Sequence, residues 1–159
     1  MAKKFELTAE FVTNIFGNKL FRIKALMAFG DVKEGELGGY VEKEENLDHD
    51  GDAWVYGDAQ VSGNARVYGN ARVSGNARVY GDADYATIKG FGSERRATTF
   101  FRLKSGEIGV RCGCFYGTIE QFRGKVKETH GDSKYAKEYL MIADLMELHF
   151  EHEEGKKCG

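Results

Sequence analysis

The chain has 159 residues, of which 42% are hydrophobic, and its 23 basic and 25 acidic side chains give a formal net charge of −2. This near balance provides no global field for nucleic acid or an anionic membrane, and the length suits one compact unit or two small ones. No apolar run is long enough to cross a membrane, and no secretory signal follows Lys3 and Lys4. Three cysteines, an odd number, argue against a disulfide framework. We therefore expect a cytoplasmic protein in a reducing compartment.

Residues 1–36 contain no repeat and are expected to form an N-terminal β cap. The strand-like segments 13–15 and 20–23 flank residues 16–19, Phe-Gly-Asn-Lys, which have the composition of a hairpin turn. Such a hairpin would cover the first turn of the repeat that follows, because a repeat stack exposes core and unpaired strand edges at its ends.

Residues 51–84 repeat a six-residue unit, Gly-(Asn/Asp)-Ala-X-Val-(Tyr/Ser), six times, and the last copy is incomplete. Within a unit Ala and Val lie two residues apart and share one face of an extended strand, while X and Tyr/Ser share the other. Gly followed by Asn or Asp supplies a corner, because both tolerate positive φ. A fixed period of this kind predicts a coil with Val and Ala inside. The alternative is a meander of short hairpins with Gly-Asn turns.

The repeat extends back beyond its clean copies. Counting in steps of six continues one inward column to Leu47 and Val41, whereas His49 and Lys43 interrupt the other column. We therefore expect a degenerate first coil before the clean copies and place the whole repeat region at residues 37–92.

This unit resembles the hexapeptide repeat of left-handed parallel β-helix proteins, in which an aliphatic and a small residue recur six apart. In that family three hexapeptides make one triangular coil, so the resemblance implies a short left-handed parallel β-helix of about three coils. The left hand departs from the usual right-handed crossover and comes from the resemblance alone. The run from Arg22-Ile-Lys-Ala-Leu through Asp31-Val-Lys-Glu-Gly-Glu-Leu-Gly-Gly-Tyr-Val to Glu45-Asn-Leu and Ala53-Trp-Val is similar to hexapeptide-repeat proteins of phages and prophages. Those proteins are often labelled transferase-like without a demonstrated activity.

Beyond the repeat, residues 93–150 are expected to form an α+β module with ββαα order, and residues 151–159 a flexible tail. Segments 98–104 and 107–112 are strand-like, and Ser105-Gly106 between them suits a two-residue hairpin. This module resembles the tails that are fused to phage hexapeptide-repeat proteins. The fold class is therefore mainly β, with the repeat between an N-terminal cap and this module.

Two helices are predicted in the module. Thr118-Ile-Glu-Gln121 has the spacing of a capping box and opens the first helix, which runs to about residue 129. Asp132 or Ser133 caps the second, which runs to about Phe150. The second helix has more apolar surface than one hairpin can cover, so we expect it to build a homo-oligomer, a dimer or a trimer. The contact residues are expected to be Tyr135, Tyr139, Ile142, Leu145 and Met146, and the neighbouring Leu140, Met141 and Leu148 widen the apolar face. The alternative is a helix that folds back and caps the last coil within one chain.

No catalytic residue, cofactor or metal site is expected. Hexapeptide-repeat acyltransferases use a histidine base between subunits, but the clean copies contain no histidine, and we expect the nearby His49 to be a surface or corner residue. Cys112-Gly-Cys114 near His130 is a poor zinc motif, because structural sites usually space their cysteines by two to four residues and use four ligands. The cysteines are expected to belong to an apolar strand face. A nucleophilic cysteine with His130 as its base lacks a supporting acid.

The outward residues of the repeat are the expected partner-binding set. Stacking in steps of eighteen residues would place Tyr68 over Asp50. The same step would place Arg72 over Trp54, in reach of a cation–π contact. No single face collects the arginines, so a phosphate-tracking groove for nucleic acid is not expected. The expected partner-binding residues are Trp54, Tyr56, Arg66, Tyr68, Arg72, Arg78 and Tyr80.

These observations together favour a non-enzymatic binding or assembly protein of phage or prophage type. The phage likeness implies an inhibitor of a host defence protein that acts by protein–protein contact, an inference from association rather than chemistry. One alternative is an acyltransferase-like enzyme with an acyl-CoA or nucleotide donor. Another is an oligomer that sequesters a small anionic ligand between its subunits.

Overall fold

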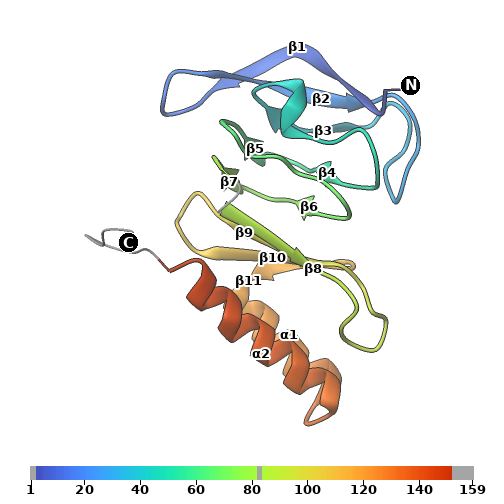
Figure 1. Ribbon diagram of the computed structural model, residues 1–159, viewed down its shortest axis with the longest axis vertical. Helices are drawn as coiled ribbons and strands as arrows, with labels where there is room; N and C mark the ends of the chain where they lie inside the picture. The colour runs from blue at the N-terminus through green and yellow to red at the C-terminus, as the bar shows by residue number, and fades with distance from the viewer. Residues whose placement is uncertain (1–2, 82–83, 152–159) are drawn as a thin grey trace.

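The computed structural model describes residues 3–81 and 84–151. The chain is mainly β with two helices. In Figure 1 a stack of short strands lies between an N-terminal hairpin and a C-terminal sheet, and the two helices cover the far side of that sheet. Of the expected tail, all but Glu151 lies outside the described residues, as do residues 82 and 83 of the last repeat copy. No helix in the described ranges is long and apolar enough to cross a membrane.

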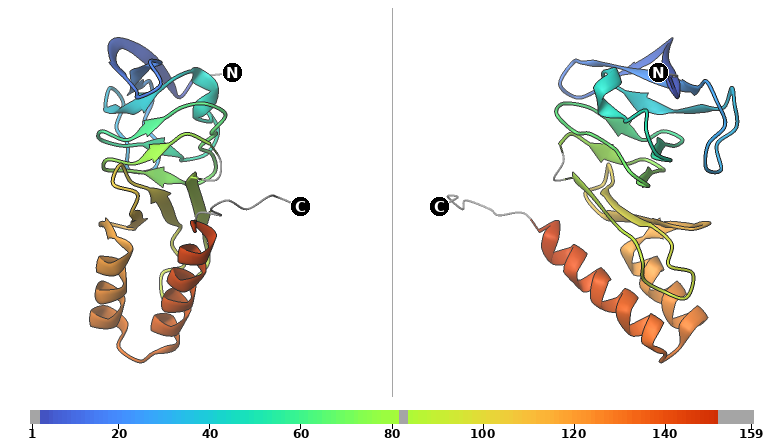
Figure 2. Two further views of the ribbon diagram at one scale, coloured as in Figure 1. Left: turned by 90° about the vertical axis from the view of Figure 1, so that its left-hand side faces the viewer. Right: turned by 45° about the vertical axis from the view of Figure 1, so that its right-hand side comes forward.

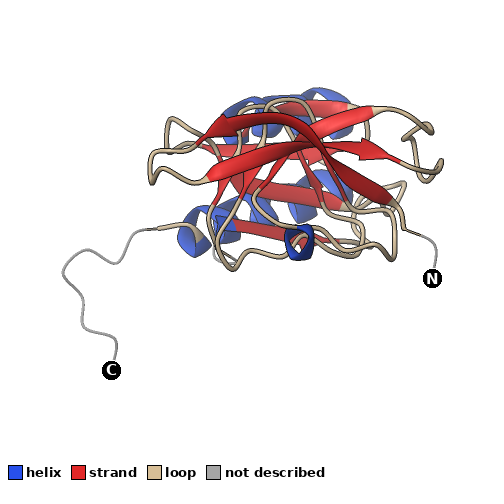
Figure 3. Cartoon of the chain, turned by 90° about the horizontal axis from the view of Figure 1, so that it is seen from above, coloured by secondary structure: helices blue, strands red, loops and turns tan. Residues whose placement is uncertain are grey.

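The N-terminal hairpin consists of β1 (Phe5–Thr13) and β2 (Lys19–Ala25), as the sequence predicts. Its turn is held by the side chain of Asn14, whose Oδ1 accepts hydrogen bonds from the backbone N–H groups of Phe16 and Asn18 at 2.9 and 3.0 Å. Strand β2 then pairs antiparallel with β3 (Leu37–Val41), so that the hairpin becomes continuous with the stack. Seen from above in Figure 3, these strands lie across the stack and form its first cover.

The stack is built from parallel pairs of very short strands. Strand β3 pairs with β5 (Gln60–Val61), which pairs with β7 (Arg78–Val79), while β4 (Trp54–Val55) pairs with β6 (Arg72–Val73). Parallel pairing rules out the hairpin meander. The expected inward columns are confirmed, because each member is at most 2% exposed: Val55, Val61, Val67, Val73, Val79, Ala59, Ala65, Ala71 and Ala77.

The first turn of the stack is longer than the expected one. Val61 pairs with Val79, a shift of 18 residues, whereas Leu47 pairs with Val67, a shift of 20. The two extra residues fall between Leu47 and β4, beyond the short 3-10 turn η1 (Glu44–Asn46). This register places Asp48 rather than Asp50 beside Tyr68, which corrects the predicted stacking. The shift of 18 residues between paired strands is therefore found only where the intervening corners contain no extra residues.

Residues of the N-terminal segment support this widened corner. The backbone N–H of Lys4 donates to Nδ1 of His49 at 3.1 Å, and the Phe5 ring stacks on the imidazole with centroids 4.3 Å apart. The Nζ atom of Lys4 donates to the carbonyl oxygens of Ala53 at 2.7 Å and Gly51 at 3.3 Å. The extra residues therefore have their backbone acceptors satisfied from outside the repeat.

The C-terminal sheet has the order β11-β10-β9-β8, and all of its pairs are antiparallel. The predicted strands and their hairpin are confirmed as β9 (Thr98–Arg102) and β10 (Ile108–Cys112), whereas β8 (Tyr85–Ile88) and β11 (Phe115–Thr118) were not predicted. One face of the sheet packs on the stack and the other on the helices. Phe101 and Leu103 join the core of the stack, and Phe100 joins the core beneath the helices. The sheet, not a helix, is therefore the second cover of the stack.

The two predicted helices are confirmed as α1 (Ile119–His130) and α2 (Lys134–His149). Thr118 caps α1 with both bonds of a capping box, and the Ser133 side chain caps α2. Figure 2 shows the helices side by side beneath the sheet. Helix α1 packs under β10 and β11, which leaves α2 on the side of the edge strand β8.

Candidate interaction surface

Trp54 is not on an outer wall of the stack, as the repeat pattern had indicated. Its side chain is fully buried, with ring centroids 5.2 Å from Phe29 and 6.4 Å from Phe5. These aromatic rings come from the N-terminal segment, which folds down over this wall (Figure 1). The structure therefore removes Trp54 from the expected partner-binding set. Trp54 is buried by a tertiary contact, because a residue that points out of its own coil can still be covered by a segment that is distant in the sequence.

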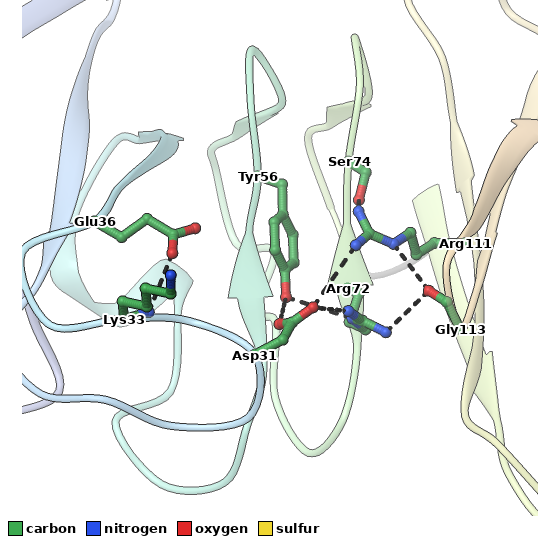
Figure 4. A network of polar contacts seen from close by, with 8 residues as sticks. All are labelled: Asp31, Lys33, Glu36, Tyr56, Arg72, Ser74, Arg111 and Gly113. Carbon is green, nitrogen blue, oxygen red and sulfur yellow. Dashed lines mark hydrogen bonds and ion pairs between the residues drawn. The ribbon is translucent and has the colours of Figure 1, made fainter.

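Two other members of that set are held in a polar network that we call the clasp, formed by Asp31, Tyr56, Arg72, Arg111 and Gly113 (Figure 4). Arg72 forms an ion pair with Asp31 and donates to the carbonyl oxygen of Gly113 at 3.2 Å and to the Tyr56 hydroxyl at 3.4 Å. Its guanidinium lies 5.6 Å from the centroid of Tyr56, so the cation–π partner is Tyr56 rather than Trp54. Arg111 covers the same ring at 4.6 Å.

The clasp connects three parts of the chain. Asp31 comes from the loop before β3, Tyr56 and Arg72 come from the stack, and Arg111 and Gly113 come from the C-terminal sheet. Burial opposes ionisation of Asp31, but the hydrogen bond from Tyr56 and the charge of Arg72 hold the pKa of this carboxyl below its ordinary value. Burial raises the pKa of the Tyr56 hydroxyl. The Asp31 carboxylate is therefore charged at neutral pH, where it pairs with Arg72.

A cleft of about 300 Å³ lies beside the clasp and includes Lys89, Arg96 and Asp52 in its lining. All three nitrogens of the Arg72 guanidinium are already engaged within the clasp. An anion in this cleft would meet Lys89 and Arg96 as exposed cations beside the engaged Arg72, and both Asp31 and Asp52 would oppose it. The geometry therefore favours a structural role for the clasp over an anion site.

Arg78 and Tyr80 are also used within the chain. Arg78 donates from Nη1 to the carbonyl oxygens of Asp58, Asn76 and Ala77 at 3.0 to 3.2 Å. The Tyr80 ring packs edge-on against Phe16 of the N-terminal hairpin with centroids 5.4 Å apart. Both side chains are half-buried.

Arg66 and Tyr68 are the members of the expected partner-binding set that the structure leaves exposed. Tyr68 is 57% exposed, and the side chain of Arg66 is 64% exposed with Asp48 at 3.9 Å. They lie next to each other along one wall of the stack and share a depression with Asp48. This wall faces the same side of the molecule as β8, because Tyr68 and Thr87 line one cleft.

The expected oligomerisation residues divide into two groups. Tyr139, Ile142 and Met146 are each at most 7% exposed and pack under the sheet of their own chain, which corrects their expected role as a subunit contact. Tyr135 and Leu145 are 40% and 53% exposed. The expectation was wrong for the first group because the four-stranded sheet is wider than the predicted hairpin. The strands β8 and β11 supply the extra cover.

Helix α2 nevertheless exposes an apolar stripe on its outer side. Met141, Leu145 and Leu148 are 71%, 53% and 64% exposed, and their spacing of four and three residues aligns them along one face. His149, one residue on, shares a cleft of about 350 Å³ with Tyr68, Tyr85, Ala86 and Thr87. This cleft thus joins the exposed wall of the stack and the edge strand to the C-terminal end of α2, next to the stripe. We call this surface the α2 flank, and its residues are Tyr68, Thr87, Met141, Leu145, Leu148 and His149.

His49 is not available as a catalytic base. Its Nδ1 accepts the backbone N–H of Lys4 at 3.1 Å, so the other nitrogen, Nε2, carries the proton that is donated to Glu44 at 2.7 Å. This hydrogen bond lowers the pKa of Glu44. With both ring nitrogens engaged and the ring stacked on Phe5, the imidazole has no lone pair free to accept a proton from a substrate.

The structure brings Cys112, Cys114 and His130 to one cleft of about 190 Å³. The Cys112 thiol accepts a hydrogen bond from Thr98 at 3.2 Å and contacts the Tyr139 hydroxyl at 3.9 Å. Burial, with Cys112 nearby, raises the pKa of Tyr139 to about 12. Cys114 is exposed in the turn after β10, not on a strand face as expected. Within the described residues no three potential ligands gather around one point that could hold a metal ion.

The parallel pairings and the buried columns agree with a comparison against known families. A family model described as the YdcK beta solenoid repeat matches residues 59–74 and 71–83. The repeat is that of a β-solenoid. No curated protein matches the chain. The solenoid match falls within the clean copies of the six-residue unit.

Proposed function

We propose that the chain is a non-enzymatic binding or assembly protein of phage or prophage type, and that its α2 flank makes the protein–protein contact. The observation that carries this proposal is the exposure of Met141, Leu145 and Leu148 on α2, a helix whose C-terminal end shares a cleft with Tyr68 and the edge strand β8. Apolar side chains gathered on one surface usually mark a contact site, and tyrosine is favoured at such sites. Five other candidate partner residues are buried or engaged within the chain: Trp54, Tyr56, Arg72, Arg78 and Tyr80.

We further propose that the solenoid is a left-handed parallel β-helix of hexapeptide type with about three coils. The shift of 18 residues between Val61 and Val79, and between Val55 and Val73, supports this proposal because it equals three hexapeptides. The longer first turn is then a coil with two extra residues at one corner.

The partner proposed from the phage likeness is a host protein, with a defence protein as the natural case. The flank suits such contact because it combines exposed apolar side chains with the exposed Tyr68, and both are favoured at protein–protein contacts. Nucleic acid is a poorer candidate for this surface, since its apolar stripe carries no row of cations.

The acyltransferase alternative is disfavoured by the engagement of both nitrogens of His49. Release of free CoA from acetyl-CoA with an amine acceptor, abolished in His49→Ala, would favour that enzyme over the binding protein. The sequestering alternative would require anion binding at Lys89 and Arg96, where Asp52 and the saturated Arg72 offer little support.

Site-specific photo-crosslinking in cells tests the binding proposal. A photoreactive residue placed at position 68 or 148 should give covalent protein adducts. The same residue at position 37 is the matched control, because Leu37 is 53% exposed on a different part of the molecule. Adducts at positions 68 and 148 and not at 37 are expected. Failure of both flank positions to give adducts would overturn the assignment of the flank as a contact surface.

A further inference from the structure

We propose that the cleft containing Cys112, Cys114 and His130 binds a small free aromatic carboxylate of about the size of benzoate. We call it the α1 cleft, because residues of α1 form one of its walls. It shares no residue with the α2 flank, so this inference goes beyond the proposed function. Its support comes from the size of the cleft, the rings in its lining and the position of one arginine.

The α1 cleft lies where the loop between β8 and β9, the turn between β10 and β11, and helix α1 meet. In Figure 1 this loop reaches down beside the helices. Two hydrogen bonds fix it to α2, because the backbone N–H of Gly92 donates to Glu138 at 3.2 Å and the Tyr139 hydroxyl donates to the carbonyl oxygen of Phe91 at 3.1 Å. A Cβ at residue 92 would lie only 2.1 Å from that hydroxyl oxygen. The loop wall of the cleft is therefore formed before a ligand binds, as is usual for small-molecule sites.

The buried part of the lining is apolar and mostly aromatic. Phe122, Val126 and Tyr139 are each at most 6% exposed. The Phe122 ring lies edge-on to Tyr139 with centroids 5.5 Å apart and 5.9 Å from the centroid of Phe115, and the His130 ring lies 6.0 Å from Tyr139. Because rings favour edge-to-face and offset contacts with other rings, this lining suits a planar ring. A cavity of about 150 Å³ holds benzene, so the 190 Å³ of the α1 cleft admits a ring with one small substituent.

The charges of the lining favour an anionic substituent. Arg96 and Lys125 are exposed cations of the lining, and Glu94 is an exposed acid. Lys125 pairs with Glu128 at 3.4 Å, whereas the Arg96 side chain has no ion pair or hydrogen bond within residues 3–81 and 84–151. Arg96 lies against the turn after β10, because a Cβ at Gly113 would be 2.7 Å from its Nη1 atom. Its guanidinium is therefore available to a ligand.

Arg96 is positioned to bind a carboxylate while the ring packs on the aromatic lining. Burial raises the pKa of Tyr139 to about 12, and the charge of Arg96 acts against this rise, so the guanidinium lies near the aromatic wall. A guanidinium can form two parallel hydrogen bonds with a carboxylate, which outweigh the solvent-screened repulsion from the exposed Glu94. Arg96 also lines the cleft beside the clasp, but Asp31 and Asp52, which oppose an anion there, do not line the α1 cleft.

A titration of the full chain with benzoate, benzamide and acetate, followed by ¹H–¹⁵N NMR, tests the proposal. Benzoate should bind with a dissociation constant on the order of 0.1–1 mM, as its size allows, and should shift the signals of the α1 cleft. Benzamide keeps the ring without the charge and should bind roughly five- to tenfold more weakly. Acetate keeps the charge without the ring and should not bind in this range. Benzoate that binds no more tightly than benzamide or acetate, or that shifts signals elsewhere, would overturn the proposal.

Four variants locate the carboxylate and the ring. Arg96→Gln should raise the dissociation constant of benzoate roughly five- to tenfold and leave that of benzamide unchanged. Lys89→Gln is the matched control, because Lys89 is an exposed cation of the same loop that does not line the α1 cleft. Thr129→Trp fills the cleft from an exposed position of α1 and should remove binding, whereas Lys127→Trp, exposed on α1 but not part of the lining, should not. Thermal melting verifies that each variant is folded. Equal losses in Arg96→Gln and Lys89→Gln, or benzoate binding that survives in folded Thr129→Trp, would refute the site.

Discussion

Lys4 offers a direct test of how the first turn of the solenoid is supported. The residue is 2% exposed, its Nζ donates to the carbonyl oxygens of Ala53 and Gly51, and it lies 4.6 Å from the centroid of the Phe29 ring. Burial lowers its pKa from the ordinary 10.5 to about 8, although the nearby aspartates act in the opposite direction. The folded protein therefore binds the Lys4 proton less tightly than the unfolded chain does.

The sign of the pH dependence follows from this difference. Below about pH 8 Lys4 is charged in both states, and the folded state bears the full penalty of burying the charge. Between pH 8 and 10.5 the folded protein releases the proton while the unfolded chain keeps it, so the free energy of unfolding rises with pH. The lowering of the Lys4 pKa from 10.5 to about 8 corresponds to a change of roughly 3 kcal/mol in the free energy of unfolding.

Urea unfolding of the wild type and Lys4→Met from pH 7 to 10 measures this effect. Met leaves two carbonyl oxygens without a donor, which costs about 1–3 kcal/mol each at every pH. The unfolding free energy of the wild type minus that of Lys4→Met should rise across the range by up to roughly 3 kcal/mol. Lys24→Met, at an exposed position of β2, is the control and should leave the pH dependence unchanged. A difference for Lys4→Met that is flat or falls with pH would refute the reasoning.

Two further predictions concern the solenoid and the clasp. Val67→Asp places an unpaired carboxylate where the wild-type side chain is fully buried and should prevent folding, so circular dichroism that shows a soluble, cooperatively melting variant would contradict the inward column. Asp31→Asn should cost roughly 1 kcal/mol or less at pH 7, because the side chain of Asp31 is 54% exposed and its interactions with Arg72 and Tyr56 are screened. The lowered pKa of Asp31 means that this stabilisation is present above about pH 4 and is lost as the pH falls through the pKa of the folded state. Urea unfolding should therefore show the cost shrinking in acid, and a cost that grows in acid would exclude the role given to the carboxylate.

The parts of the fold that the sequence predicts are those fixed by neighbouring residues. The columns of Val and Ala follow from alternation within a six-residue unit, and the start of α1 follows from the spacing of Thr118 and Gln121. Asn14 and Gly17 likewise determine the turn between β1 and β2. In each case one local pattern is sufficient.

The parts that the sequence does not predict depend on distant contacts. Trp54 stands at an outward position of the repeat but is buried by rings from Phe5 and Phe29. The extra residues before Trp54 are supported by the main chain and side chain of Lys4, 45 positions or more away. Strand β8 is only four residues long and pairs with β9 across a nine-residue connection that begins at Lys89, so no local period reveals it.

The position of these covers also constrains how the protein can assemble. The N-terminal hairpin closes one end of the solenoid and the C-terminal sheet closes the other, within the same chain. End-to-end stacking of solenoids is therefore blocked, because neither end presents an open coil to a neighbour.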